Sequence, residues 1–343
     1  MSLQKILKNQ TISFYEYMEN CLYHNEYGYY STKNNVFNKD GDFYTASSIS
    51  KAFAHCIYNF IYSLGLEDIN ILELGGGNGF LSQNILDKNK NLIKNYFLYE
   101  PNKAMRLLQQ KTLKHYDVVF LDKLPVKDKK PIIVIANEVL DAMPVHLYLK
   151  KEHMYFEKMV CVGSENSFVL KNVDNIPSQA KDILDRYNNQ DYVVSYNPNI
   201  VTFLKNLQSI SSSVLLLFFD YGYKEYELFN DVRNGQSPRG FYKHLLVNNP
   251  LANMAKMDLT YNVNYSSLVK NAIDCGYEFE GYTLQSSFIM ELLQDENYDT
   301  QEKNAIKQLC FDDSIFNAFK AICFSKNFKA NVLGFKRDIS HKM

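Results

Sequence analysis

The feature that most constrains the fold is a short apolar run that leads into four glycines. Residues 69–74 read Ile-Asn-Ile-Leu-Glu-Leu, and glycines follow at positions 75, 76, 77 and 79. Apolar residues at 80, 81, 85 and 86 then recur at helical spacing. This order of strand, glycine turn and helix predicts the first unit of a nucleotide-binding α/β sheet. Glycine suits the turn because it bends the backbone tightly and leaves space for a ligand.

The spacing of the glycines separates the candidate ligands. A dinucleotide site needs Gly-x-Gly-x-x-Gly, but the third position here is Phe80 or Ser82, depending on register. The pattern Glu-x-Gly-x-Gly-x-Gly over 73–79 instead resembles the first motif of class I S-adenosylmethionine (SAM) methyltransferases. An acid at the end of a second strand, 96–100, is suited to bind both ribose hydroxyls. We therefore predict SAM as the cofactor, held by Glu73, Gly75, Gly77, Gly79 and Glu100.

Length, charge and cysteine usage exclude several classes of protein. The 343 residues allow one large domain with insertions or two domains. The net charge of −1, with dispersed lysines and arginines, gives no argument for a nucleic-acid partner. Six cysteines without a Cys-x-x-Cys pair predict a reduced, cytoplasmic protein without a metal site. We expect no membrane span, because no apolar run reaches the roughly 18 residues required.

The order of the elements predicts an α/β fold with a Rossmann-like, mostly parallel sheet of the class I methyltransferase type. Strands are expected at 69–74, 96–100, 117–121, 131–137 and 214–219, a helical stretch at 284–326 and a last strand at 330–336. The expected organisation is a helical N-terminal cap at 1–65, a first part of the core at 66–144, inserted meander and helices at 145–210, and the remaining core at 211–343 with an excursion at 224–262.

Polar side chains follow the predicted strands, where ligands bind in sheets of this kind. Asp122 follows the third strand and is expected near the adenine, with a surface turn as the alternative. Asn137 ends the fourth strand and is a candidate cofactor contact. Glu138 and Asp141 come next, and two carboxylates at a strand end are costly unless they meet cations or water. They either complement a helix dipole or hold a cationic substrate, and the local sequence leaves both open.

Residues 40–46, Asp-Gly-Asp-Phe-Tyr-Thr-Ala, form a predicted turn before a helix that begins near Ser48 or Ser50. Asp42 and Thr45 are candidates to reach over the cofactor, although the local sequence favours a plain helical cap. Earlier, Ser13 with Glu16 three residues later predicts a capping box.

Motifs along most of the chain match one family. They are Ile12-Ser-Phe14 with Gly28-Tyr-Tyr30, Gly41–Ala46, Glu73–Gly79, Ala136–Pro144, Asp220–Gly222, Tyr242–His244 and Asp258–Thr260. The chain thereby resembles the MidA family of SAM-dependent methyltransferases, whose mitochondrial members are arginine methyltransferases acting in respiratory complex I assembly. The sequence departs from the family pattern at Ser47–Ser48 and at Tyr261–Asn264.

The resemblance implies a methyltransferase that acts on a protein side chain, with arginine as the expected acceptor and a complex I subunit among the candidate substrates. It places Glu138 and Asp141 in the active site, with His244 or Asp42 assisting. Carboxylates are suited to this because they bind a guanidinium at two points. A SAM-binding assembly factor with little catalysis and a small-molecule methyltransferase remain as alternatives. The oligomeric state, a homodimer included, stays open.

Overall fold

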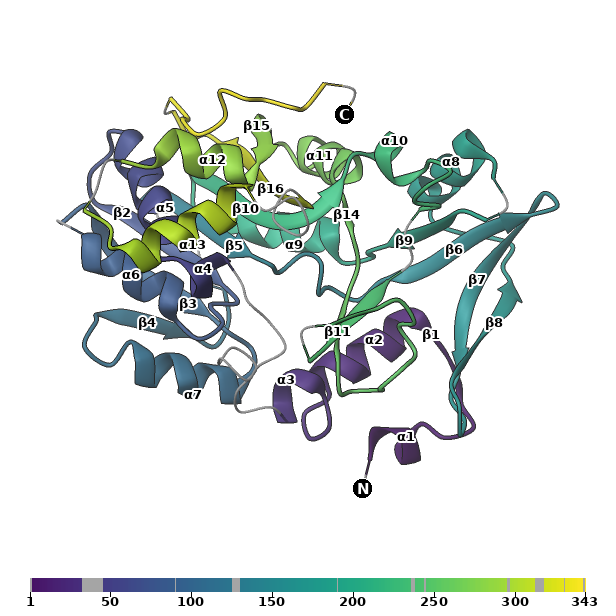
Figure 1. Ribbon diagram of the computed structural model, residues 1–343. Helices are drawn as coiled ribbons and strands as arrows, with labels where there is room; N and C mark the ends of the chain where they lie inside the picture. Colours follow the sequence, from purple (N-terminus) through teal and green to yellow (C-terminus); the bar gives the residue numbers. More distant parts are fainter. Residues whose placement is uncertain are drawn as a thin grey trace. The chain divides into compact units, whose positions relative to one another are not determined.

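A computed structural model of the chain describes residues 2–32, 46–89, 91–124, 130–189, 191–235, 238–243, 245–294, 297–311, 318–329, 331–341 and 343 (Figure 1). The chain divides into two compact units. The first, here called the core unit, comprises Tyr44–Val139, Val201–Gly222 and Leu268–Met343. The second unit comprises Met1–Phe43, Leu140–Ile200 and Tyr223–Ser267.

A mixed sheet forms the centre of the core unit. Its strands follow the order β15-β16-β10-β5-β2-β3-β4. From β10 to β4 neighbouring strands are parallel, whereas β16 is antiparallel to both β10 and β15. The prediction of a mostly parallel sheet is therefore corrected to a mixed one. The strands are β2 (Ile69–Leu74), β3 (Ile93–Tyr99), β4 (Val118–Leu121), β5 (Ile132–Asn137), β10 (Val214–Tyr223), β15 (Glu278–Leu284) and β16 (Phe319–Lys326).

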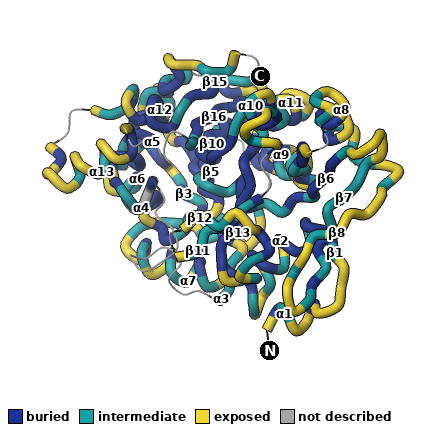
Figure 2. Tube along the Cα trace, turned by 45° about the vertical axis from the view of Figure 1, so that its right-hand side comes forward, coloured by how far each residue is buried: buried dark blue, intermediate teal, exposed yellow. Residues whose placement is uncertain are grey.

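Helices cover both faces of this sheet, so its central strands are buried along most of their length (Figure 2). On one face the Phe219 ring contacts Phe53 of α5 (Lys51–Ser63) and Phe288 of α12 (Gln285–Leu292), with ring centroids 5.0 and 5.1 Å apart. On the other face the Phe218 ring contacts Phe203 of α9 (Ile200–Ser209), with ring centroids 6.1 Å apart. Neighbouring strand residues point to opposite faces, so this pairing explains the continuous apolar run at 214–219.

The helices of the core unit lie where the chain passes between strands. In Figure 1, α12 and α13 lie beside α5. The helices are α4 (Ala46–Ile49), α5 (Lys51–Ser63), α6 (Phe80–Lys88), α7 (Lys103–Thr112), α9 (Ile200–Ser209), α11 (Tyr265–Asp274), which begins in the second unit, α12 (Gln285–Leu292) and α13 (Thr300–Phe311). The side chain of Ser50 accepts a hydrogen bond from the Ala52 N–H and caps α5.

The C-terminal prediction was wrong in two places. The stretch 284–326, expected to be helical, contains α12 and α13 but ends in the strand β16. The last strand expected at 330–336 does not form, since none of residues 331–336 is in a strand. A short apolar run such as Ala321–Phe324 is buried on both sides, so its periodicity cannot separate a central strand from a buried helix.

The second unit is built on two antiparallel sheets. The larger has the order β1-β7-β6-β9, with β8 also paired to β7, and the smaller has the order β12-β11-β13. The predicted meander at 145–175 is confirmed as β6, β7 and β8, whereas β9 was missed. The strands of these sheets are β1 (Thr11–Ser13), β6 (His146–Lys151), β7 (Met154–Cys161), β8 (Ser167–Asn172), β9 (Val193–Tyr196), β11 (Arg239–Tyr242), β12 (Leu245–Val247) and β13 (Asp258–Thr260). The two-residue strand β14 (Val263–Asn264) belongs to neither sheet.

Among the residues that the structure describes in this unit, five helices accompany the sheets: α1 (Leu3–Ile6), α2 (Phe14–Tyr23), α3 (Tyr29–Thr32), α8 (Ser178–Tyr187) and α10 (Glu225–Leu228). The capping box predicted for α2 is confirmed. The Glu16 N–H donates to Ser13 Oγ at 3.1 Å, and the Glu16 carboxylate accepts from the Ser13 N–H at 2.8 Å.

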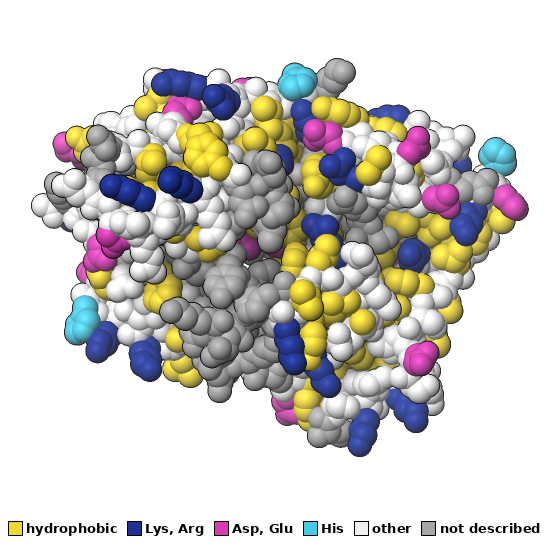
Figure 3. All heavy atoms as spheres, in the orientation of Figure 1, with side chains coloured by type: hydrophobic (Ala, Val, Ile, Leu, Met, Phe, Trp, Pro, Cys, Tyr) yellow, Lys and Arg dark blue, Asp and Glu magenta, His cyan; other side chains and the backbone are white. Residues whose placement is uncertain are grey.

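Lysines and arginines are scattered over the face shown in Figure 3, as expected for a chain with almost no net charge. Within the described part of the chain, no helix combines the length and the apolar character needed to cross a bilayer.

Candidate functional site: the glycine loop and its neighbours

The glycine loop, residues 75–79, follows β2 and turns the chain into α6. Gly75, Gly77 and Gly79 have φ angles of 62°, 54° and 85°. These values lie in the left-handed region that favours glycine, which explains why the loop requires this residue. The Gly75 N–H donates to the Tyr99 carbonyl of β3 at 3.0 Å, and the Gly79 N–H donates to the Gly76 carbonyl at 2.8 Å. The loop is therefore fixed to the carboxyl end of the neighbouring strand.

Glu73 lies directly beneath the glycine loop, with only 2% of its surface exposed. Its carboxylate accepts hydrogen bonds from Ser82 Oγ and from the Tyr96 hydroxyl, the latter at 2.6 Å. A Cβ atom on Gly76 would lie 3.2 Å from Glu73 Oε1, so the loop rests on this side chain. Burial raises the pKa of Glu73, and the two hydrogen bonds partly oppose that shift. Glu73 supports the loop; its predicted contact with the cofactor stays a prediction.

Glu100 follows β3 and is the predicted ribose acceptor. Its Oε1 accepts from the Asn102 N–H at 3.0 Å, and its Oε2 accepts from Gln109 Nε2 at 3.1 Å. Burial raises the pKa of Glu100, and these two hydrogen bonds lower it in part. Each carboxylate oxygen has two lone pairs, so both oxygens keep capacity for a ligand hydroxyl. This geometry suits the predicted role.

Asp122 follows β4 as predicted, and its side chain is 91% exposed. It forms an ion pair with Arg106 of α7. The same guanidinium donates to the Leu121 carbonyl and, at 3.1 Å, to the Glu100 carbonyl. Arg106 thus joins the carboxyl ends of β3 and β4, a role that the sequence analysis missed. The predicted contact between Asp122 and adenine stays a prediction.

Asn137 and Glu138 end β5, the strand between β2 and β10. Glu138 has a φ of 55°, unusual for a residue with a side chain. Its N–H donates to the Phe219 carbonyl at 2.8 Å, and its Oε1 accepts from Asn137 Nδ2 at 3.0 Å. A Cβ atom on Gly75 would lie 3.2 Å from Val139 Cγ2, so this segment packs against the glycine loop. Glu138 is therefore held close to the predicted SAM site by backbone and side-chain contacts.

Asp141 belongs to the second unit, because the division of the chain falls between Val139 and Leu140. The residue is 4% exposed, and its backbone carbonyl accepts from the Tyr261 N–H at 3.1 Å. Burial, then the charge of Asp258 and more weakly that of Asp141, raises the pKa of Tyr30. The Tyr30 hydroxyl donates to Asp258 at 2.9 Å. The joint action of Glu138 and Asp141 stays a prediction.

Three predicted site residues, Asp42, Thr45 and His244, lie outside the described residues. Of the two asparagines at which the chain departs from its family, Asn262 is buried, whereas Asn264 has a local role. Its Oδ1 accepts from the Ser267 N–H at 3.0 Å at the start of α11. This departure accordingly supports a helix end.

Two buried polar atoms make the loop suited to a polar ligand. Among the described residues, Asn78 Nδ2 in the loop and Asn137 Oδ1 beside it have no hydrogen-bond partner. Such groups are costly unless something binds them, and together they offer one donor and one acceptor. With the left-handed glycines and Glu100, they fit SAM. The fold and this site define a class I SAM-dependent methyltransferase.

Comparison with known proteins supports that class. A family model described as "Putative S-adenosyl-L-methionine-dependent methyltransferase" matches residues 52–283, and the chain belongs to this family. A solved structure from Burkholderia thailandensis, a "likely methyl transferase" bound to S-adenosyl-homocysteine, has a TM-score of 0.86 and 25% identity over 97% of this chain and 92% of that chain. The α/β fold, the enzyme class and the SAM cofactor are thus confirmed.

Two curated relatives are similar over much of their length. "Protein arginine methyltransferase NDUFAF7, mitochondrial" from Danio rerio is 26% identical over 79% of this chain and 70% of its own. The Rattus norvegicus protein of the same name is 24% identical over 79% of this chain and 68% of its own.

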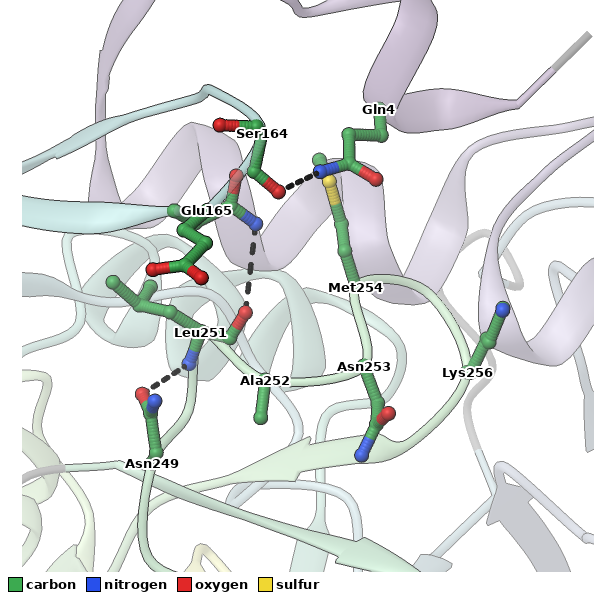
Figure 4. A pocket seen from close by; sticks show the side chains of 10 residues that line it. Gln4, Ser164, Glu165, Asn249, Leu251, Ala252, Asn253, Met254 and Lys256 are labelled. Carbon is green, nitrogen blue, oxygen red and sulfur yellow. Dashed lines mark hydrogen bonds between the residues drawn. The ribbon is translucent and has the colours of Figure 1, made fainter.

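A polar cavity of about 350 Å³ lies in the second unit (Figure 4). In Figure 4, Gln4 Nε2 donates to the Ser164 carbonyl at 3.2 Å, and the Leu251 N–H donates to Asn249 Oδ1 at 3.0 Å. No site residue that the structure describes lines this cavity, so it is separate from the glycine loop.

Proposed function

We propose that this enzyme methylates an arginine side chain of a partner protein. The observation that carries the proposal is Glu138, an anchored carboxylate beside the glycine loop. The names of the relatives from Danio rerio and Rattus norvegicus support the same acceptor. An arginine guanidinium is planar and permanently charged, and a carboxylate can accept two of its N–H groups at once.

Glu138 would act by binding and orienting the acceptor. SAM, when bound, supplies a methyl group on a sulfonium. Hydrogen bonds from a guanidinium to the Glu138 carboxylate would fix the plane of the guanidinium. They would also draw positive charge away from the nitrogen that faces the methyl group. The anchoring contacts from Phe219 and Asn137 limit the freedom of Glu138, and such preorganisation is a main source of catalysis when two groups must meet.

Asp141 and His244 are further proposed catalytic residues. Asp141 supplies a second carboxylate, which is buried, and His244 is carried over from the family motif Tyr242–His244. We expect Asp141→Asn and His244→Ala each to lower methyl transfer more than SAM affinity. Equal losses in both quantities would instead assign these residues to cofactor binding.

The test of the proposal is Glu138→Gln, which keeps the shape and removes the charge. We expect transfer to fall about a hundredfold, equivalent to about 2.7 kcal/mol, while SAM affinity changes little. Glu67→Gln, at an exposed acid of the same unit, is the matched control. The acceptor is obtained by capturing the protein with its partners from lysate and mapping methyl groups on them. Radiolabelled transfer followed by amino-acid analysis then identifies the modified residue.

The outcomes separate the alternatives. Methyl-lysine or a labelled metabolite would refute arginine as the acceptor, and full activity of Glu138→Gln would refute its role. SAM binding without any transfer would favour an assembly factor. A labelled subunit of respiratory complex I would support the proposed partner. The proposed cytoplasmic location is tested by cell fractionation, and a proposed homodimer by analytical ultracentrifugation.

A further inference from the structure

Gln109 lies in α7 with no exposed surface, and its amide contacts two parts of the predicted cofactor site. Nε2 donates to the Gly77 carbonyl at 3.0 Å and to Glu100 Oε2 at 3.1 Å. Gly77 belongs to the glycine loop, and Glu100 follows the end of β3. The loop and this strand end are also joined by the backbone hydrogen bond from the Gly75 N–H to the Tyr99 carbonyl. A single side chain therefore bridges the two groups predicted to bind SAM.

The two hydrogen-bond partners fix the orientation of this amide. The Gly77 carbonyl and the Glu100 carboxylate are both acceptors, so the NH₂ group must face them and both of its hydrogens are used. Gln109 Oε1 is consequently turned away and, among the described residues, has no hydrogen-bond partner. An unpartnered buried acceptor costs free energy. A methionine-like side chain would fill the same space without that cost, so packing alone does not account for an amide here.

We infer that Gln109 is a positioning residue for SAM, which holds the glycine loop and the Glu100 carboxylate at a fixed separation. The Asn102 N–H holds the other carboxylate oxygen, so Glu100 is restrained from both sides. Without Gln109, the loop and the carboxylate would have to be ordered by the ligand itself, at the expense of affinity. The inference depends on cofactor binding at this loop and is independent of the methyl acceptor.

Replacing the amide of Gln109 by a carboxyl should make the positioning role depend on pH. In Gln109→Glu, an ionised carboxyl would face the Gly77 carbonyl and Glu100, both of which repel it. Two carboxyls in such contact share one proton as the pH falls, and the protonated group can donate again. The other charged groups that act on Glu100 are Arg106, which favours its ionisation, and Glu73, which opposes it.

The experiment measures binding of S-adenosylhomocysteine by calorimetry between about pH 5.5 and pH 8. We expect Gln109→Met to weaken binding by about tenfold or more at every pH, relative to the wild type at the same pH. Gln109→Glu should bind more weakly still at pH 8 and recover as the pH falls. Gln110→Met, at the exposed neighbouring position of α7, is the control and should bind like the wild type.

The outcomes are distinguishable. Wild-type affinity in Gln109→Met overturns the inference, as does a Gln109→Glu profile parallel to that of Gln109→Met. If Gln109→Met fails to fold, as judged by circular dichroism, the pH profile of Gln109→Glu is compared with that of the wild type instead, and parallel profiles overturn the inference. Failure of the wild type to bind overturns this inference together with the SAM site, whereas loss of arginine methylation alone affects only the proposed acceptor.

Discussion

The backbone N–H of Glu138 donates to the carbonyl of Phe219 at 2.8 Å while Glu138 itself has a φ of 55°. The bond extends the pairing of β5 with β10 by one residue beyond the last strand residue, Asn137. A left-handed residue with a side chain costs on the order of 1 kcal/mol or more and persists where its surroundings determine it. The direction of the Glu138 side chain is thus set by the sheet.

Replacing Gly77 by valine should abolish SAM binding. A φ of 54° is unfavourable for a β-branched residue, and the side chain would also occupy the loop that the ligand approaches. Calorimetric titration measures the loss, with circular dichroism to confirm the fold. Gly65→Val is the matched control, because Gly65 has a φ of 65° and open space around it. Equal SAM affinity in both variants would contradict the proposed cradle.

Removing the hydroxyl of Tyr96 should destabilise the core unit. Tyr96→Phe leaves the buried Glu73 carboxylate without one of its two hydrogen bonds. We expect the free energy of unfolding in urea to fall by about 1–3 kcal/mol. Tyr116→Phe removes a similar bond to Asp87 at an exposed position and should change it by less than about 0.5 kcal/mol. Equal effects would show that burial of the carboxylate does not matter.

Stability should depend on pH through Glu73. Its pKa is raised by burial above the ordinary value of 4.5, so the folded state retains a proton that the unfolded chain releases. The contribution of Glu73 is therefore fully present below about pH 4.5 and is lost as the pH rises through the folded-state pKa. The free energies of unfolding of the wild type and of Glu73→Gln, measured from below pH 4.5 upward, test this dependence. The variant should gain stability relative to the wild type as the pH rises, and parallel curves would disprove the contribution of Glu73.

Arg106→Lys should lower the free energy of unfolding by about 1 kcal/mol. An ammonium cannot reproduce the planar set of donors that reaches the Glu100 and Leu121 carbonyls together. Asp122→Asn removes only the 91% exposed partner of the same guanidinium and should change stability by less than about 0.5 kcal/mol. Denaturant titration of both variants measures the difference. If Asp122→Asn has the larger effect, the surface ion pair is the dominant contact.

The sequence predicted the parts of the site that depend on residues close together in the sequence. The strand, glycine turn and helix at 69–88 can be read locally, because left-handed turns require glycine and a buried strand requires apolar residues. Glu100 was predicted as the acid at the end of the next strand along the chain, and that strand, β3, pairs with β2. The capping box of α2 was equally local.

Contacts between distant residues could not be predicted in this way. Gln109 reaches a carbonyl 32 residues away, and only the rotation of α7 about its axis brings the two together. The ion pair of Arg106 with Asp122 depends on the same rotation. The strand β16 was missed because its apolar run becomes recognisable as a strand only when it pairs with Val214–Tyr221, about a hundred residues earlier.

The reversed strand β16 has a consequence for synthesis of the chain. It lies between β10 and β15 and comes after both in the sequence, so a growing chain that has not reached Phe319 leaves the facing edges of those strands unpaired. Unpaired edges attract other strands and expose a chain to aggregation. Among the strands that the structure describes, β16 is made last, and the nascent protein has to shield the edges of β10 and β15 until then.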